Sequence, residues 1–172
     1  MKKTLRFSLM ALLAVFGMGS AMAEDIIWSE DFSSYEANDV PEGCTNGASA
    51  TKIYNESLAG GTAPELLIGK KSNDVAGGSY TVTINLNGKS GAMFLQYKAN
   101  YDRLEVTTTT AGVTIGDKEV SGKSYTYPLT VASGTTSMTL VFTNVYTSNV
   151  RFDDVKVYQG TALKPAGLNW GT

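Results

Sequence analysis

Residues 151–158 read Arg-Phe-Asp-Asp-Val-Lys-Val-Tyr and place two adjacent carboxylates, Asp153 and Asp154, among residues that favour β-strands. The apolar alternation slips at this acidic pair, because Phe152 is out of phase with the two valines that follow. One extra residue in a strand is what a β-bulge accommodates. We therefore expect residues 149–158 to form the closing strand of a β-domain, with a bulge at the acidic pair.

A second acidic segment, Trp28-Ser29-Glu30-Asp31-Phe32, lies near the start of the chain. Neighbouring carboxylates within one strand are costly to desolvate unless a positive charge lies between them. The two acidic segments therefore predict that the first and last strands meet around a cation, and carboxylate oxygens are the ligands that calcium prefers. The alternative is that Asp153 and Asp154 face water or pair with Arg151 and Lys156.

The start of the chain predicts a secretory signal peptide over residues 1–23. Basic residues precede an apolar run at 7–18 that is short for a bilayer span, and Ala21-Met22-Ala23 supplies small residues at the cleavage positions. The alternative is an N-terminal membrane anchor. We expect an exported protein, secreted, periplasmic or at the cell surface, with no membrane span once the signal is removed.

Composition excludes several classes of function. Residues 24–172 keep all 16 acidic residues and 11 of the 14 basic ones, a formal charge of −5 that disfavours a nucleic-acid partner. The chain has no histidine and one cysteine, Cys44. Ser-His and Cys-His pairs, histidine-metal sites and an intrachain disulfide are thereby excluded. We interpret Cys44 as an unpaired small residue of a loop, the alternative being a reactive thiol.

Residues 24–160 show the period-two alternation of short strands and no sustained helical period. Ser79–Leu86 and Gly91–Ala99 flank Asn87-Gly88, a dipeptide that favours positive φ angles, so we expect a hairpin. Pro128 lacks a ladder donor and predicts an edge strand or a bulge. Further strands are expected at 50–54, 65–68, 104–108, 113–120 with a turn at 116–117, 124–131, and, in a central position, 137–145. This pattern predicts one all-β domain, an antiparallel β-sandwich of the jelly-roll kind.

The opening segment and the closing Phe-Asp-Asp-Val-x-Val pattern at 152–157 resemble the galactose-binding-domain-like jelly rolls of carbohydrate-binding modules and bacterial surface proteins. The resemblance implies that the first and last strands run side by side and hold a structural calcium ion. It also implies the ligands of that ion: Glu30 and Asp153, with Asp31 or Asp154.

Residues 161–172 leave the strand pattern and contain Pro165-Ala166-Gly167-Leu168. This stretch is similar to the start of an immunoglobulin-like domain in related secreted chains. We expect a linker or the start of a following domain in a longer chain. The alternative is a tail that folds back onto the sandwich.

A sugar site needs exposed aromatic rings beside polar groups. Alternation places the tyrosines at 97, 125 and 127 on apolar faces, where core packing is expected. Tyr101 lies in a polar turn, and Tyr146 lies among asparagines. The candidate ligand-binding residues are Tyr101, Asp102, Arg103, Tyr146 and Asn149.

The acidic residues fall in loops, in turns and in the two end segments, and Glu105 stands alone on its strand. A glycosidase needs two carboxylates facing one another across the scissile bond. We therefore expect a non-catalytic module that binds carbohydrate or another surface ligand. A structural or adhesive spacer domain without a small-molecule site is the alternative.

Overall fold

The computed structural model describes residues 24–160; the expected signal peptide at 1–23 and the expected linker at 161–172 lie outside the described residues. Within the described range the chain forms twelve strands and no helix. None of its described segments is therefore a helix long and apolar enough to cross a membrane.

Eight strands form the larger sheet, in the order β3-β4-β12-β6-β10-β8, with β1 paired to β12 and β9 paired to β10. Four strands form the smaller sheet, in the order β2-β5-β11-β7. All neighbouring strands in both sheets are antiparallel. The larger sheet contains β1 (Asp25–Glu30), β3 (Lys52–Tyr54), β4 (Glu65–Ile68), β6 (Gly91–Ala99), β8 (Val113–Ile115), β9 (Glu119–Ser121), β10 (Ser124–Val131) and β12 (Val150–Gln159). The smaller sheet contains β2 (Cys44–Thr45), β5 (Ser79–Asn85), β7 (Leu104–Thr108) and β11 (Ser137–Asn144).

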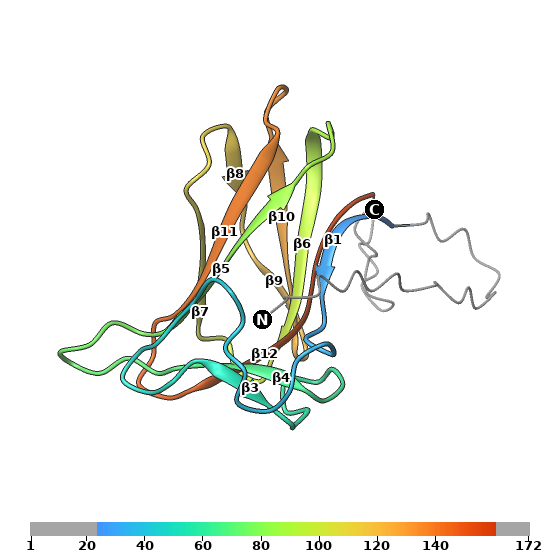
Figure 1. Cartoon of the computed structure of the whole chain (residues 1–172). Coiled ribbons are helices and arrows are strands. Elements are labelled where there is room, and N and C mark those ends of the chain that lie inside the picture. The colour runs from blue at the N-terminus through green and yellow to red at the C-terminus, as the bar shows by residue number, and fades with distance from the viewer. Residues whose placement is uncertain (1–23, 161–172) are drawn as a thin grey trace, which may run out of the picture.

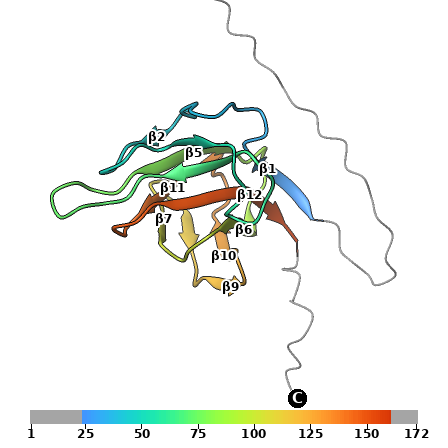
Figure 2. The same ribbon diagram turned by 90° about the horizontal axis from the view of Figure 1, so that it is seen from below.

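The two sheets pack face to face, which confirms the predicted all-β antiparallel sandwich (Figure 1). The view from below places β5 and β11 on one side of the molecule and β6 and β10 on the other (Figure 2). The long strands β6, β10 and β11 each turn one side-chain row inward, as period-two alternation requires.

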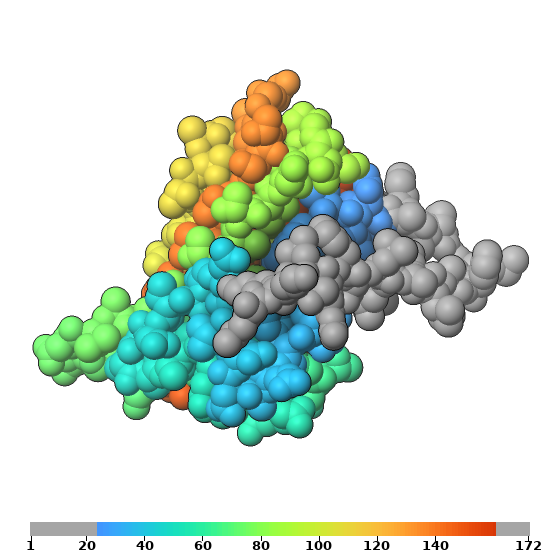
Figure 3. All heavy atoms as spheres, in the orientation of Figure 1, coloured from blue at the N-terminus to red at the C-terminus, as the bar shows by residue number. Residues whose placement is uncertain are grey.

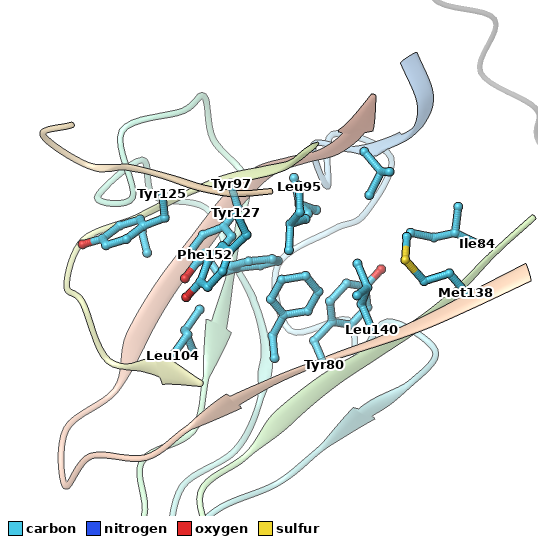
Figure 4. Packing of buried hydrophobic residues seen from close by; sticks show 14 of the residues in the cluster. Tyr80, Ile84, Leu95, Tyr97, Leu104, Tyr125, Tyr127, Met138, Leu140 and Phe152 are labelled. Carbon is cyan, nitrogen blue, oxygen red and sulfur yellow. The ribbon is translucent and has the colours of Figure 1, made fainter. Parts of the chain in front are cut away.

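The core is rich in aromatic rings from both sheets (Figure 4). Phe142 of the smaller sheet meets Phe152 and Tyr97 of the larger one, with ring centroids 4.9 and 5.7 Å apart. Such pairs add about 0.5–1.5 kcal/mol each beyond the burial of their area. Tyr97, Tyr125 and Tyr127 are 1, 4 and 8% exposed, which confirms their expected place in the core.

The turn at Asn87-Gly88 has the expected backbone but joins two different sheets. The φ angles are +51° at Asn87 and +77° at Gly88. However, β5 pairs with β2 and β11, whereas β6 pairs with β10 and β12, so the predicted hairpin is wrong. The reason is that Ile84 on β5 and Leu95 on β6 enter one core from opposite layers, and the turn crosses between them. Alternation specifies which face of a strand is buried, and it leaves the pairing partner open.

The last strand, β12, contains the predicted bulge. Its register with β6 shifts between Asp153 and Lys156, and Asp154 has a φ of +46°. Because β6 occupies one edge of β12, β4 and β1 share the other: β4 pairs with Val150–Phe152 and β1 with the residues after the bulge. The expectation that the first and last strands are neighbours is therefore confirmed.

Pro128 lies where β10 changes its partner. Towards the outer edge of the sheet, β9 pairs with residues 124–126 and β8 with residues 129–131. Pro128 falls between them, and its carbonyl accepts a hydrogen bond of 2.8 Å from the amide of Gly116. The predicted edge strand or bulge is therefore wrong, because β10 lies between β6 and the pair β8 and β9 and keeps an unbroken register with β6. The missing amide donor of Pro128 is tolerated at the gap between β9 and β8. The expectation of a central strand at 137–145 is confirmed, because β11 lies between β5 and β7.

Candidate functional site

A pocket of about 420 Å³ lies where the start of β7 and the end of β11 approach the connection between β8 and β9. Its walls contain three of the five predicted ligand-binding residues, namely Asp102, Arg103 and Tyr146. The remaining lining residues are Leu104, Glu105, Lys118 and Val145. The antiparallel pairing of β7 with β11 explains why segments more than 40 residues apart in sequence meet here.

Arg103 and two tyrosines form an aromatic–cationic surface at this pocket. The guanidinium carbon of Arg103 is 4.0 Å from the ring centroid of Tyr101 and 5.7 Å from that of Tyr146. Both tyrosines are 50% exposed, which confirms the expectation that they face solvent. Arg103 also donates through Nη1 to Ser148 Oγ. Because a cation–π contact at an exposed site contributes about 0.5–1 kcal/mol, these contacts together fix the guanidinium before any ligand arrives.

Tyr146 is carried by a loop whose backbone is held by Asn144. The Asn144 side chain is fully buried. Its Oδ1 accepts from the Tyr146 amide at 3.0 Å, and its Nδ2 donates to the carbonyls of Ser148 and Ile68 at 2.8 and 3.2 Å. All the polar positions of this amide are therefore used to fix the loop, and Tyr146 stands on a rigid base.

Asn149 lies in the same loop base but outside the pocket lining. Its Oδ1 accepts hydrogen bonds from Ser49 Oγ at 2.6 Å and from the Lys70 amide at 3.0 Å. Asn149 thereby links its own loop to the loops that contain Ser49 and Lys70. These contacts fix the base of the loop that carries Tyr146. Gly77 belongs to this base as well, since a Cβ there would collide with the carbonyl of Asn144.

The segment between β4 and β5 extends from this base beside the pocket. It projects from the body of the molecule and is drawn in green in Figure 3. The Lys71 amide in this segment donates to the carbonyl of Tyr146 at 2.8 Å. The loop that carries Tyr146 is thus supported from β4 as well as from β11.

Sequence reasoning missed Lys118 and Glu105 as pocket residues. Lys118 forms an ion pair with Asp102, and only the pairing of β8 and β9 with β10 brings them together. Glu105 had a usable signal, because alternation places it on the same side of the strand as Arg103. Among residues 24–160, Glu105 has no ion-pair partner.

The acidic end segments meet at the bulge of β12. A second pocket, of about 260 Å³, has three of the four predicted metal ligands in its walls: Glu30, Asp31 and Asp154. Its other lining residues are Ser29, Gln96, Lys98, Val155 and Lys156. Within residues 24–160, no three His, Cys, Asp or Glu side chains gather closely enough to hold one metal ion. Backbone carbonyls would have to complete the coordination of a calcium ion here.

Glu30 and Asp31 each use one side-chain oxygen within their own turn. Glu30 Oε1 accepts from the Phe32 amide at 2.7 Å, and Asp31 Oδ1 accepts from the amide and hydroxyl of Ser33 at 3.0 and 2.7 Å. Phe32 has a φ of +56°, so the chain turns sharply after β1 and buries the Phe32 ring in the core. Burial raises the pKa of the Glu30 carboxyl above its ordinary value.

Asp153 is the fully buried member of the acidic group. Its Oδ1 accepts from the Asp154 amide at 2.8 Å, and its Oδ2 has no hydrogen-bond partner among the described residues. Loss of hydration, together with the negative charges of Asp154, Glu65 and Asp31, raises the pKa of Asp153 to about 7. The negative charge of Asp154 has a basic partner, because its Oδ2 lies 2.7 Å from Lys98 Nζ.

Arg151 and Lys156, the cations expected as alternative partners of the aspartates, bind other carboxylates. Lys156 pairs with Glu24. Arg151 Nη2 lies 2.5 Å from Glu56 Oε2, and its Nε lies 3.7 Å from Oε1 of the fully buried Glu65. The predicted pairing of these two cations with the aspartates at the bulge is therefore wrong.

The loop at 55–64 covers this charged group. A Cβ at Gly61 would collide with Asp153 Oδ2, so the absence of a side chain allows the loop to close over the carboxylate. Within the described chain, the buried side-chain atoms without a partner are Glu65 Oε1, Arg151 Nη1 and Asp153 Oδ2. All three belong to this one network. Such atoms are normally satisfied by ordered water or an ion.

Cys44 lies on β2, opposite Tyr80 of β5, so its expected place in a loop is wrong. The residue is half-buried, and burial raises the pKa of its thiol to about 12. At neutral pH the thiolate is therefore scarce, which favours the interpretation of Cys44 as an unreactive residue.

No protein-family model matches this chain, and no significant match exists among curated proteins or solved structures. The chemistry of the pocket is nevertheless specific. Tyr146, the donors of Arg103 and the carboxylate of Glu105 line one pocket, and Tyr101 lies outside the lining, against Arg103. Aromatic rings beside hydrogen-bond donors and acceptors are chemically suited to a ligand that is apolar on one face and rich in hydroxyl groups around its edge.

Proposed function

We propose that this domain is a non-catalytic module that binds carbohydrate at the surface formed by Tyr101, Arg103 and Tyr146. One observation supports it above all: two half-exposed tyrosine rings flank an immobilised guanidinium beside a pocket of about 420 Å³. A sugar ring presents C–H groups that pack on an aromatic face and hydroxyl groups that bind Arg, Asp and Glu.

The same observation favours binding over the spacer alternative. A spacer domain needs only a polar surface, whereas here two large aromatic side chains are 50% exposed next to polar groups. Tyr146 also stands on a loop that a buried asparagine, Asn144, holds in place. Rigid exposed aromatic residues are typical of binding surfaces, because little side-chain entropy is lost when a ligand arrives.

The charges at the pocket favour binding without catalysis. Hydrolysis of a glycoside uses one carboxylic acid and one carboxylate on opposite sides of the bond. At this pocket Asp102 is paired with Lys118, which leaves Glu105 as the single unpaired carboxylate in the lining. The pocket therefore offers recognition groups and lacks a matched acid–base pair.

We further assign the domain to the galactose-binding-domain-like jelly rolls of exported bacterial proteins. The pairing of β1 with β12 and the acidic bulge between β4 and β1 support this assignment. They are the features on which the resemblance of the sequence depends.

We also propose a structural calcium ion at the bulge, with ligands drawn from the predicted set Glu30, Asp31, Asp153 and Asp154. Because no three of these side chains gather closely enough to share one ion, backbone carbonyls would have to supply most of the coordination. The unpartnered, fully buried Oδ2 of Asp153 fits a cation ligand, and the neighbouring carboxylates supply negative charge. Calcium would neutralise these carboxylates and link β1 to β12. Its role would be stability, since the carbohydrate pocket contains none of these residues.

The carbohydrate proposal is tested by screening residues 24–172 on a glycan array and by polysaccharide pulldown. The Tyr101→Ala, Tyr146→Ala double variant should bind the selected glycan at least about tenfold more weakly, a loss of about 1.4 kcal/mol. Tyr54→Ala is the matched control, because Tyr54 stacks on a different arginine, Arg151, at 4.2 Å, whereas Tyr101 and Tyr146 both lie against Arg103 of the pocket lining. The absence of any glycan ligand at high protein concentration would refute the proposal.

A further inference from the structure

We infer that this pocket selects uncharged sugars, whose neighbouring hydroxyl groups bridge Arg103 and Glu105, over sugars that carry a carboxylate or an amine. The inference rests on the proposed carbohydrate function and specifies the chemical class of the ligand. It assigns Glu105 a role in specificity.

In the part of the chain that the structure describes, the pocket has equal numbers of acidic and basic residues, but only one of each is free to contact a ligand. Its walls hold two acidic residues, Asp102 and Glu105, and two basic ones, Arg103 and Lys118. Asp102 and Lys118 form an ion pair with one another. Among residues 24–160, Arg103 and Glu105 have no ion-pair partner, so one positive and one negative group remain available to a ligand.

The backbone keeps these two groups together and apart from the core. Leu104, between them, is 4% exposed and packs in the core, so the residues on either side point to the pocket. Two residues of an extended strand span about 7 Å. Arg103 is held on Tyr101 and Ser148, which restrains it from swinging towards Glu105. The pocket therefore presents a fixed donor, Arg103, and an exposed acceptor, Glu105, a short distance apart.

This arrangement matches a pair of neighbouring hydroxyl groups. A guanidinium only donates hydrogen bonds and an ionised carboxylate only accepts them, whereas each hydroxyl group does both. One hydroxyl can accept from Arg103 while its neighbour donates to Glu105, and the ring between them remains free to pack against an exposed tyrosine.

Charged sugars meet an unfavourable partner in the same space. A uronate carboxylate would be attracted by Arg103 but repelled by Glu105, and an ammonium group would be attracted by Glu105 but repelled by Arg103. Asp102 and Lys118 neutralise one another and favour neither ligand. Like charges without compensation discriminate against a ligand as effectively as favourable contacts select for it. An uncharged sugar avoids both repulsions.

The test compares three oligosaccharides with one backbone: a β-1,4-glucan hexamer, its C6-oxidised uronate form and its 2-amino form. A glycan array containing neutral, uronate and amino-sugar chains is read in parallel. Residues 24–172 should bind neutral chains most tightly, with less than about a twofold change in Kd between 50 and 500 mM NaCl, because no net charge is neutralised. A tightest ligand that is anionic or cationic, bound with strong salt dependence, would overturn the inference and leave carbohydrate binding intact.

Glu105→Gln provides the residue-level test. It should weaken binding of the neutral ligand by up to about tenfold, since a hydrogen bond to a charged acceptor is replaced by one to a neutral amide oxygen. It should also improve binding of uronate chains. Glu42→Gln is the control, as it makes the same charge change at an exposed residue outside the pocket lining. If Glu105→Gln leaves both ligands unchanged while the tyrosine variants lose binding, Glu105 has no role in selection. If no array glycan binds, both proposals fail.

Discussion

The buried carboxyl group of Asp153 predicts that the domain, when free of metal, loses stability as the pH rises. The pKa of this group is raised to about 7 in the fold because it is desolvated and surrounded by Asp154, Glu65 and Asp31. An acid with a raised pKa binds its proton more tightly in the folded state. Its contribution to stability is therefore fully present below the unfolded pKa and is lost as the pH rises through about 7.

The magnitude follows from the shift. The ordinary value is 3.8 and the folded value is about 7, a difference of about 3 units. At about 1.36 kcal/mol for each unit, Asp153 accounts for a loss of up to about 4 kcal/mol between pH 4 and pH 8. This is a large part of the 5–15 kcal/mol that is typical of whole domains.

Asp153→Asn isolates this effect from the other carboxylates. The amide oxygen can still accept from the Asp154 backbone, and the side chain stays uncharged at every pH. Urea unfolding in a chelator, followed by the fluorescence of Trp28, which packs against the core, gives the free energy of unfolding. The variant should gain stability relative to the parent as the pH rises from 4 to 8. Parallel pH profiles of the two proteins would refute the raised pKa.

Further predictions follow from the same region and from the loop base. Calcium at 100 times its Kd should stabilise the fold by about 2.7 kcal/mol and raise Tm by several degrees over the chelator control, and an unchanged Tm would count against the ion. Gly61→Ala should lower the free energy of unfolding by about 1–3 kcal/mol, because the new Cβ meets Asp153 Oδ2. In an Asp153→Ala background the loss should be smaller, and an equal loss in both backgrounds would disprove the contact. Asn144→Ala should lower the free energy of unfolding by about 2–4 kcal/mol and weaken glycan binding, because three hydrogen bonds are lost. Asn55→Ala, at an exposed residue, is the control and should change neither stability nor binding. A thermal melt measures the first effect and a binding titration the second.

Features that depend on neighbours in sequence were predictable. The slip in alternation at Asp153 revealed the bulge, and the polar turn around Tyr101 revealed an exposed ring. The partners in space were not, because they depend on which strands pair. The ion pair of Lys118 with Asp102 and the approach of Glu65 to Arg151 both require the completed larger sheet.

The error at Asn87-Gly88 has the same origin. The dipeptide determines a tight reversal of the chain, and the amphipathic strands on both sides satisfy a hairpin and a crossing between layers equally well. The choice is made by distant strands, since β11 pairs with β5 and β10 pairs with β6. A local pattern cannot contain that information.

The central position of β12 has a consequence for the order in which the molecule can be built. Residues 150–159 are made last among the strands, yet they join β1, β4 and β6, so the larger sheet lacks its middle until synthesis has passed them. Pairing across more than 100 residues closes slowly, because a long loop must be ordered first. We expect a nascent chain to lack the larger sheet until residues 150–159 have been made. Such a delay is compatible with the export predicted from residues 1–23, in which the chain would cross a membrane before it folds.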